Sequence, residues 1–135
     1  MIVVDAMVLA DFLAGEASLR RAAIRLSEED PVWISCSIWR YEVGNVLWKK
    51  VRFQDMPPDA AHHSIEQGEA MLAETVEKLQ WCAILDLANG RGLSFYDASY
   101  VWLAQSRGLM LRTRDAEILR GCPGVSAPMP EERSR

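Results

Sequence analysis

The feature that most constrains this fold is an alternation of short apolar runs with segments of helical spacing. Residues 2–4, 32–34 and 109–111 are apolar runs, each long enough for a short, fully buried strand. The segments between them repeat apolar residues every three or four positions, as a helix with one buried face does. Strands that alternate with helices predict a parallel sheet covered by helices on both faces. The predicted fold class is therefore α/β, a three-layer α/β/α sandwich with a short central parallel sheet.

The remaining elements follow from apolar spacing and from helix-start and helix-stop residues. We expect helices over 8–13, 17–26, 38–51, 58–79, 83–88 and 98–105, a helical turn over 116–119 and a last strand over 125–127. Pro58 suits the first turn of the long helix that follows it, and Ser35 or Ser37 is expected to cap the helix over 38–51. Residues 1–127 are predicted to form one domain, and residues 128–135 a frayed tail.

Composition excludes several classes of protein. With 135 residues, 50% of them hydrophobic and 25% charged, the chain can bury the core of one domain and is not wholly disordered. Its net charge of -4 excludes polycationic wrapping of nucleic acid but allows a local basic rim. No uncharged apolar stretch approaches the roughly 18 residues of a membrane span. The N-terminus lacks a basic segment, and the three cysteines form no CxxC pair, so a cytoplasmic protein with free thiols is expected.

Three acids stand where a strand ends or a helix begins. Asp5 directly follows the run over 2–4, Asp115 follows the run over 109–111 by a few residues, and Asp97 opens the helix over 98–105. Each one alone is explained by helix N-capping, because a carboxylate accepts the free N–H groups of a first turn. None of them belongs to a capping box, since no Glu or Gln follows three residues later.

Glu42 is harder to explain by local structure. At helical spacing it shares an apolar stripe with Ile38 and Val46. A carboxylate on such a stripe is unfavourable unless it is paired, hydrogen-bonded or bound to a metal. Arg40 and Lys50 project away from Glu42 on a helix. An ion pair with a cation elsewhere in the chain remains open as an alternative.

Together the four acids predict a metal site. If Asp5, Glu42, Asp97 and Asp115 meet at the carboxyl edge of the sheet, where ligands bind in such folds, they repel one another strongly. No lysine or arginine is placed to neutralise all four, whereas a divalent cation would. Hard oxygen ligands without His or Cys favour Mg²⁺ or Mn²⁺ over zinc. Such an ion supplies an activated water and stabilises a phosphoryl transition state.

Four segments of the chain resemble PIN-domain ribonucleases, and more narrowly VapC-type toxins of bacterial and archaeal type II toxin–antitoxin pairs. They are VVDAMVLADFL with Asp5, WRYEVGNVLWK with Glu42, YDASYVWLA with Asp97, and LRTRDAEIL with Asp115, in an order that spans residues 1 to about 126. The last segment resembles the Thr-x-Asp signature of the family and supplies Thr113. Asn45 lies one turn after Glu42. One departure is Met7, which stands where the family often has Ser or Thr.

The resemblance implies metal-dependent endonucleolytic cleavage of RNA by a metal-activated water, leaving a 3′-hydroxyl and a 5′-phosphate. It implies that Asp5, Glu42 and Asp97 bind Mg²⁺ or Mn²⁺ and that Asp115 completes the site directly or through water. Thr113 and Asn45 would orient the acids. We further expect Arg112 and Arg114, which flank Thr113, to contact substrate phosphates. His62 and His63 are adjacent on a polar helix, so they are predicted to be surface residues without a catalytic role.

The resemblance also implies partners: an RNA substrate, a second copy in a homodimer, and a VapB-like antitoxin. The antitoxin would lay a helix over the apolar helices that carry Trp39 and Trp48. Two alternatives stay open, a housekeeping PIN nuclease that processes RNA without an antitoxin and a catalytically inactive PIN-fold binding module. The presence of all four acids argues against the inactive module.

Overall fold

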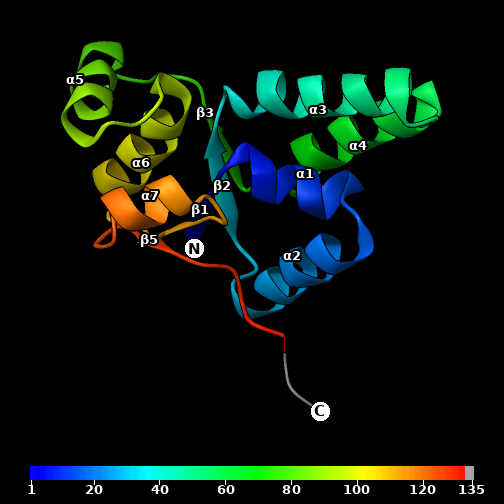
Figure 1. The fold of residues 1–135 in the computed structure, drawn as a ribbon, viewed down its shortest axis with the longest axis horizontal. Helices are drawn as coiled ribbons and strands as arrows, with labels where there is room; N and C mark the ends of the chain where they lie inside the picture. Colours follow the sequence, from blue (N-terminus) through cyan, green and yellow to red (C-terminus); the bar gives the residue numbers. More distant parts are fainter. Residues whose placement is uncertain (133–135) are drawn as a thin grey trace.

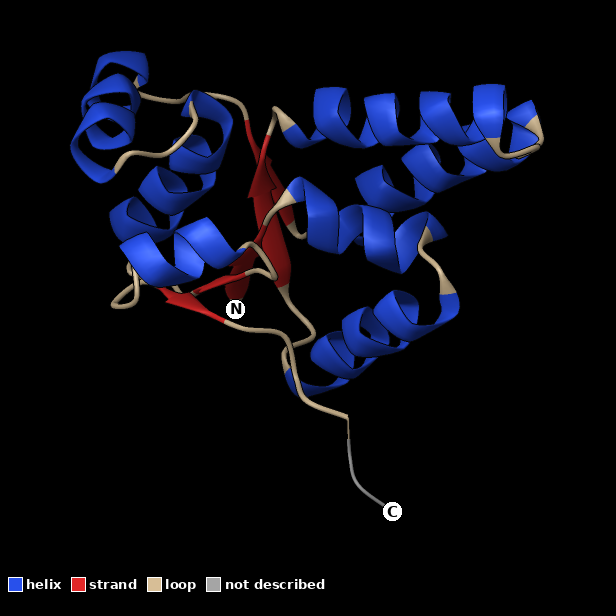
Figure 2. Cartoon of the chain, in the orientation of Figure 1, coloured by secondary structure: helices blue, strands red, loops and turns tan. Residues whose placement is uncertain are grey.

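A five-stranded parallel sheet lies between two groups of helices in the computed structural model, which describes residues 1–132 (Figures 1 and 2). The strand order is β3-β2-β1-β4-β5, which places the first strand at the centre of the sheet. Helices α1 to α4 lie on one side of the sheet and α5 to α7 on the other (Figure 1). The elements are β1 Ile2–Val4, α1 Ala6–Ala14, α2 Ala17–Glu29, β2 Trp33–Cys36, α3 Trp39–Phe53, α4 Pro58–Met71, β3 Glu74–Val76, α5 Trp81–Arg91, α6 Phe95–Arg107, β4 Leu111–Arg112, α7 Ala116–Gly121 and β5 Ser126–Ala127. The predicted fold class is confirmed.

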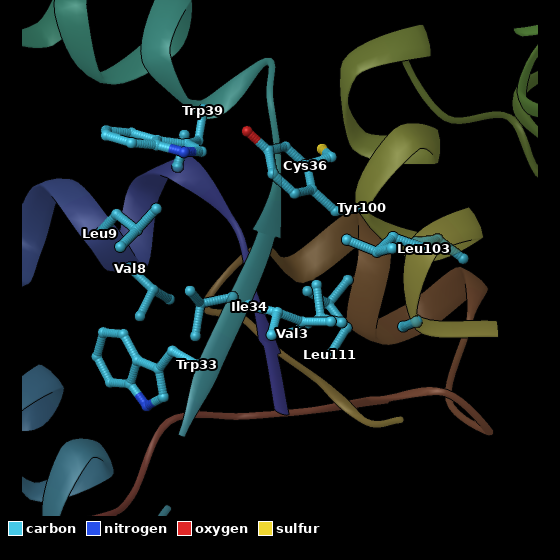
Figure 3. Packing of buried hydrophobic residues seen from close by; sticks show 14 of the residues in the cluster. Val3, Val8, Leu9, Trp33, Ile34, Cys36, Trp39, Tyr100, Leu103 and Leu111 are labelled. Atoms are coloured by element: carbon cyan, nitrogen blue, oxygen red, sulfur yellow. The ribbon is translucent and has the colours of Figure 1, made fainter. Parts of the chain in front are cut away.

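The strands β1 and β2 are almost entirely apolar because both of their faces are buried. Val3 on β1 pairs in parallel with Ile34 on β2 and with Leu111 on β4, and none of the three side chains is exposed. Figure 3 shows Val8, Leu9, Trp33 and Trp39 on one side of β2, and Tyr100, Leu103 and Leu111 on the other. Burial on both faces explains why these strands lack the alternating pattern of a half-exposed sheet.

The predicted helix over 58–79 is correct as far as Met71 and wrong beyond it. Helix α4 ends at Met71, and the chain then forms the edge strand β3, which pairs in parallel with β2. Ala73 enters this pairing by donating from its amide to the carbonyl oxygen of Trp33 at 2.9 Å. The side chains of β3 are only half-buried or exposed. Its apolar pattern is therefore weak, and pairing with β2 decides its conformation.

Two other boundaries and one helix cap differ from prediction for local reasons that the hydrogen bonds show. Helix α6 starts at Phe95 because the hydroxyl of Ser94 caps it, accepting from the amide of Asp97 at 3.0 Å. The predicted strand over 109–111 starts two residues later, since the amide of Leu109 closes α6 by donating to Ala104. Neither Ser35 nor Ser37 caps α3, and the hydroxyl of Ser35 instead donates to the Val4 carbonyl at 2.7 Å.

The ends of the chain add one contact and leave the tail untested. The guanidinium of Arg112 donates to the carbonyl oxygen of Pro128 at 3.0 Å, which ties the start of the predicted tail to β4. Residues 133–135 of that tail lie outside the described residues, so the domain boundary at residue 127 stays a prediction.

Within residues 1–132, no helix is long and apolar enough to cross a membrane. Cys36 and Cys122 are buried and Cys82 is exposed, all as free thiols.

Two helical glycines provide a test of the packing between α3 and α4. A Cβ on Gly68 would lie 2.9 Å from the Trp39 ring and 3.2 Å from Leu13, whereas a Cβ on Gly44 would meet no atom within 4 Å. We expect Gly68→Ala to lower the free energy of unfolding by about 1–3 kcal/mol through overpacking. Gly44→Ala should raise it by up to about 1 kcal/mol through helix propensity. Urea denaturation of both variants measures the difference, and equal effects would contradict the close approach of α4 to Trp39.

Candidate active site

Asp5 lies at the carboxyl end of the central strand and is buried, with 4% of its surface exposed. Its Oδ1 caps α1 by accepting from the amide of Val8 at 3.1 Å. Its Oδ2 accepts from the hydroxyl of Thr113 at 2.5 Å. Burial, with a smaller contribution from the charges of Asp97 and Glu42, raises the pKa of Asp5 to about 6 despite these two bonds. Asp5 is therefore both a helix cap and a carboxyl group whose negative charge the fold disfavours.

Thr113 and Asp115 join the end of β4 to this central acid. The Thr113 hydroxyl donates to Asp5 and accepts from the amide of Asp115 at 3.0 Å. Asp115 in turn caps α7, where its Oδ1 accepts from the amides of Glu117 and Ile118 at 2.9 and 3.0 Å. The predicted role of Thr113 in orienting an acid agrees with this geometry, and Asp115 is a helix cap that also lies near Asp97.

Glu42 lies in the first turn of α3 and is held by a residue of α6. Its Oε1 accepts from the hydroxyl of Tyr100 at 2.8 Å, and Tyr100 is 1% exposed. Burial raises the pKa of Glu42, and the charge of Asp97 adds to that rise. Within residues 1–132 no lysine or arginine forms an ion pair with Glu42. Among the described residues, an ion pair therefore does not explain this half-buried acid.

Asp97 completes the acidic group from the first turn of α6. Burial makes the largest contribution to raising the pKa of Asp97, and the charges of Asp115 and Glu117 also raise it. The four predicted acids thus act on one another electrostatically, and no ion pair in the described chain includes any of them. In residues 1–132, no three His, Cys, Asp or Glu side chains lie close enough to hold one ion directly.

These residues fit a hydrated divalent cation better than a fully caged one. Their oxygen donors are hard, their charges are uncompensated, and a cation would lower the free energy of each ionised carboxylate. Mg²⁺ typically keeps several waters and takes only one or two protein carboxylates. A loose group of acids suits that coordination, while it would not suit an all-protein site such as a structural zinc centre.

Asn45 and Met7 border the acids in a hollow of about 400 Å³, lined also by Glu42 and two tyrosines, Tyr41 and Tyr96. Asn45 is exposed and donates to none of the acids in the described chain. Its predicted role in orienting Glu42 therefore stays a prediction. Met7 is 42% exposed on the wall of this hollow, so the Ser or Thr usual in the family is replaced by an apolar surface.

The two arginines predicted to contact phosphates have different surroundings. Arg112 is turned toward the tail, where it bonds to Pro128. Arg114 pairs with the buried Asp11, its Nε lying 2.7 Å from Oδ2 and its second bond measuring 3.2 Å. Arg114 also lines a second hollow of about 320 Å³ together with Lys50. Phosphate contact stays a prediction for both arginines, and the position of Arg114 beside Lys50 suits it better.

Two side chains that shape the site were missed from the sequence. Asp11 is an acid within the apolar stretch over 8–13, which is the signal that identified Glu42 and would have identified Asp11 as well. Tyr100 carried no such signal, because an aromatic residue in a helix usually predicts core packing. His62 and His63 are exposed on α4, which confirms that they are surface residues.

Comparison with known proteins agrees with this geometry. The PIN-domain family model matches residues 2–122, and the chain therefore belongs to the PIN-domain family. Exonuclease VapC9 of Pyrobaculum aerophilum is 38% identical over 85 residues, which cover 63% of each chain. Ribonuclease VapC3 of the same organism is 28% identical over 131 residues, covering 94% of this chain and 98% of that one. The chain thus spans less than two thirds of the first relative in that match.

Solved structures share the fold. The crystal structure of PAE2754 from Pyrobaculum aerophilum superposes with a TM-score of 0.74 at 30% identity, covering 93% of this chain and 81% of that chain. A chain of a toxin–antitoxin complex from Klebsiella pneumoniae gives a TM-score of 0.67 at 21% identity, covering 94% of this chain and 96% of that chain. These likenesses confirm the PIN fold of this chain.

The raised pKa of Asp5 predicts a pH-dependent stability without metal. A raised pKa favours the protonated carboxyl in the folded state, so the free energy of unfolding falls as pH rises from about 3.9, the ordinary value. That fall ends above the folded pKa of about 6. Asp5→Asn removes this titration. In the presence of a chelator, we compare the free energy of unfolding of Asp5→Asn with that of the unsubstituted protein. The difference, variant minus unsubstituted, should increase by on the order of 1–3 kcal/mol between pH 4 and pH 7.

Urea denaturation of both proteins across that pH range measures the difference. Because Asn keeps only one acceptor oxygen, it adds an offset that does not depend on pH, and the slope alone tests the prediction. A difference that stays constant with pH would show that Asp5 is not a carboxyl of raised pKa.

Proposed function

We propose that this chain is a metal-dependent endoribonuclease and the toxin of a toxin–antitoxin pair. The observation that carries the proposal is the group formed by Asp5, Glu42, Asp97 and Asp115, whose charges oppose one another with no arginine or lysine paired to them in the described chain. The names of two relatives, an exonuclease and a ribonuclease, support a nuclease. Endonucleolytic cleavage of RNA is the mode that the family resemblance favours.

Asp5, Glu42, Asp97 and Asp115 would together hold a hydrated Mg²⁺ or Mn²⁺, one or two of them directly and the others through bound water. The chemistry supplied by a bound divalent cation is activation of a water for attack on phosphorus and neutralisation of charge in the transition state. The chain's own residues orient the acids. Thr113 directs Asp5, and Tyr100 directs Glu42 and favours its ionised form by hydrogen bonding. Arg114 and Lys50, which line an adjoining hollow together with Asp11 and Glu16, would contact a neighbouring phosphate of the RNA.

An exposed apolar groove between α3 and α4 supports the proposed antitoxin. It has a volume of about 280 Å³ and includes Leu47, Val51 and Ile65, with Trp48 54% exposed. Exposed aromatic residues are common anchors of protein interfaces. The Klebsiella pneumoniae neighbour is a toxin–antitoxin complex. We also propose a homodimer and a cytoplasmic location, as in the family that the sequence resembles.

The two alternatives make different demands on the molecule. A housekeeping nuclease without an antitoxin would have no need of the exposed α3–α4 groove, whose apolar lining favours a toxin. An inactive binding module would have no need for buried, mutually repelling acids, which lower stability without a cation. The acids and the groove together favour the toxin.

Cleavage of a circular single-stranded RNA tests the nuclease, because only an endonuclease can open a circle. We expect linear product with Mg²⁺ or Mn²⁺ and none in EDTA. Asp97→Asn should reduce the rate by more than about 100-fold, since it removes a proposed metal carboxylate. Asp59→Asn, an exposed acid in the first turn of α4, is the matched control and should cleave normally.

Unchanged cleavage in EDTA would overturn the metal mechanism. Full activity of Asp97→Asn would remove Asp97 from the site. Cleavage of linear RNA from its ends, with the circle left intact, would make the chain an exonuclease.

Co-expression of this chain with the product of the small reading frame next to its gene tests the proposed antitoxin. If that product binds the α3–α4 groove, Trp48→Asp should weaken the complex by about 30-fold or more, the effect of losing an interface anchor. Leu85→Asp on α5, where Leu85 is 51% exposed, is the control and should bind normally. Calorimetric titration of the purified chains measures both, and equal affinities would place the antitoxin on another surface.

A further inference from the structure

Two exposed tyrosines stand directly before two of the acids in the chain. Tyr41 precedes Glu42 on α3, and Tyr96 precedes Asp97 on α6. The exposed fractions of the two tyrosines are 81% and 57%. Adjacent residues on a helix point in directions about 100° apart, so each ring projects beside its acid rather than over it. The same helical turns that place the acids therefore place an aromatic ring next to each of them.

Both rings border the same hollow. Tyr41 from α3 and Tyr96 from α6 line the 400 Å³ hollow with Glu42, Asn45, Met7 and Val46. Figure 1 shows α3 and α6 on opposite sides of the sheet, so the hollow bridges the two helical groups. Its volume falls in the range of about 300–1,000 Å³ typical of ligand sites. Neither tyrosine ring stacks on another aromatic ring of the described chain, which leaves their faces available.

The chemistry of the lining favours a neutral, flat ring over a phosphate. Glu42 carries negative charge into the hollow, and no lysine or arginine lines it, so a phosphate placed there would be repelled. A nucleobase is neutral, has two faces for stacking, and presents N–H groups and ring nitrogens at its edge. The exposed amide of Asn45 offers both a donor and an acceptor to such an edge. Arg114 and Lys50 line the second hollow, on the other side of Met7 and Val46.

From this arrangement we propose that the hollow between Tyr41 and Tyr96 is a nucleobase subsite, which stacks one unpaired base of the RNA beside the phosphate that the acids cleave. This inference rests on the proposed function. It assigns the two tyrosines to substrate binding and Asn45 to the edge of the base.

Steady-state cleavage of a short single-stranded RNA tests the subsite, once the unsubstituted protein has shown where it cuts. Tyr41→Ala and Tyr96→Ala should each raise KM by about tenfold, as the loss of base stacking does, with kcat unchanged. Tyr41→Phe and Tyr96→Phe keep the ring, so they should raise KM by much less than the alanine variants do. Phe53→Ala is the matched control, because Phe53 is 69% exposed on α3 and does not line the hollow.

Removal of a base from the RNA identifies the stacked nucleotide. An abasic ribose on one side of the cleaved bond should raise KM of the unsubstituted protein by a similar factor and should have no further effect on Tyr41→Ala. Effects of the abasic site and of Tyr41→Ala that multiply would overturn the proposal, because they would show two independent contacts.

Three further outcomes separate this inference from the function on which it rests. If the unsubstituted protein cleaves no RNA, the proposed function fails, and the subsite fails with it. If it cleaves RNA and the alanine variants keep the same KM, the subsite alone is wrong. If those variants keep KM but change the molecular mass in light scattering, the tyrosines belong to an interface between two copies of the chain, which also overturns the subsite.

Discussion

The hydrogen bond from Thr113 to Asp5 joins residues that lie 108 positions apart, at the centre of the molecule. It connects the ends of β1 and β4, whose parallel pairing brings their carboxyl ends to one edge of the sheet. Asp5 is buried there, and without its two hydrogen bonds the carboxyl group would be strongly destabilising. The other acids approach this fixed point from α3, α6 and α7.

The buried and half-buried acids of this fold are stabilised in two different ways. Asp11 is neutralised by Arg114 in a bidentate ion pair. Asp5, Glu42 and Asp97 are also buried or half-buried, yet they receive only neutral hydrogen bonds, from Thr113, Tyr100 and backbone or serine groups. The chain can thus pair a buried carboxylate with a cation, yet within residues 1–132 it forms no such pair at this edge of the sheet. That contrast is the structural reason to expect an added cation.

At two of the four acids, helix capping does not exclude a role in the proposed metal site. Asp5 and Asp115 each cap a helix, so the simple structural explanation of these residues is correct. The same bonds also fix the carboxyl groups in place, which a metal site requires. Asp97 differs, because Ser94 caps α6 and leaves the Asp97 carboxylate free of that role. A capping acid and a functional acid are therefore not exclusive alternatives in this fold.

The buried strands, the α/β class and the choice of the four acids as candidate site residues could be predicted from the amino-acid sequence. They depend on local patterns: apolar runs, helical spacing, and a charge where an apolar residue is expected. The tertiary structure decided the rest. The strand β3 exists because β2 pairs with it. Tyr100 donates a hydrogen bond to Glu42, which lies 58 positions away in the chain, and Arg114 pairs with Asp11, which lies 103 positions away. The hollow between Tyr41 and Tyr96 joins two helices. Such contacts depend on which distant residues the packed core brings together, and no local pattern in the chain encodes them.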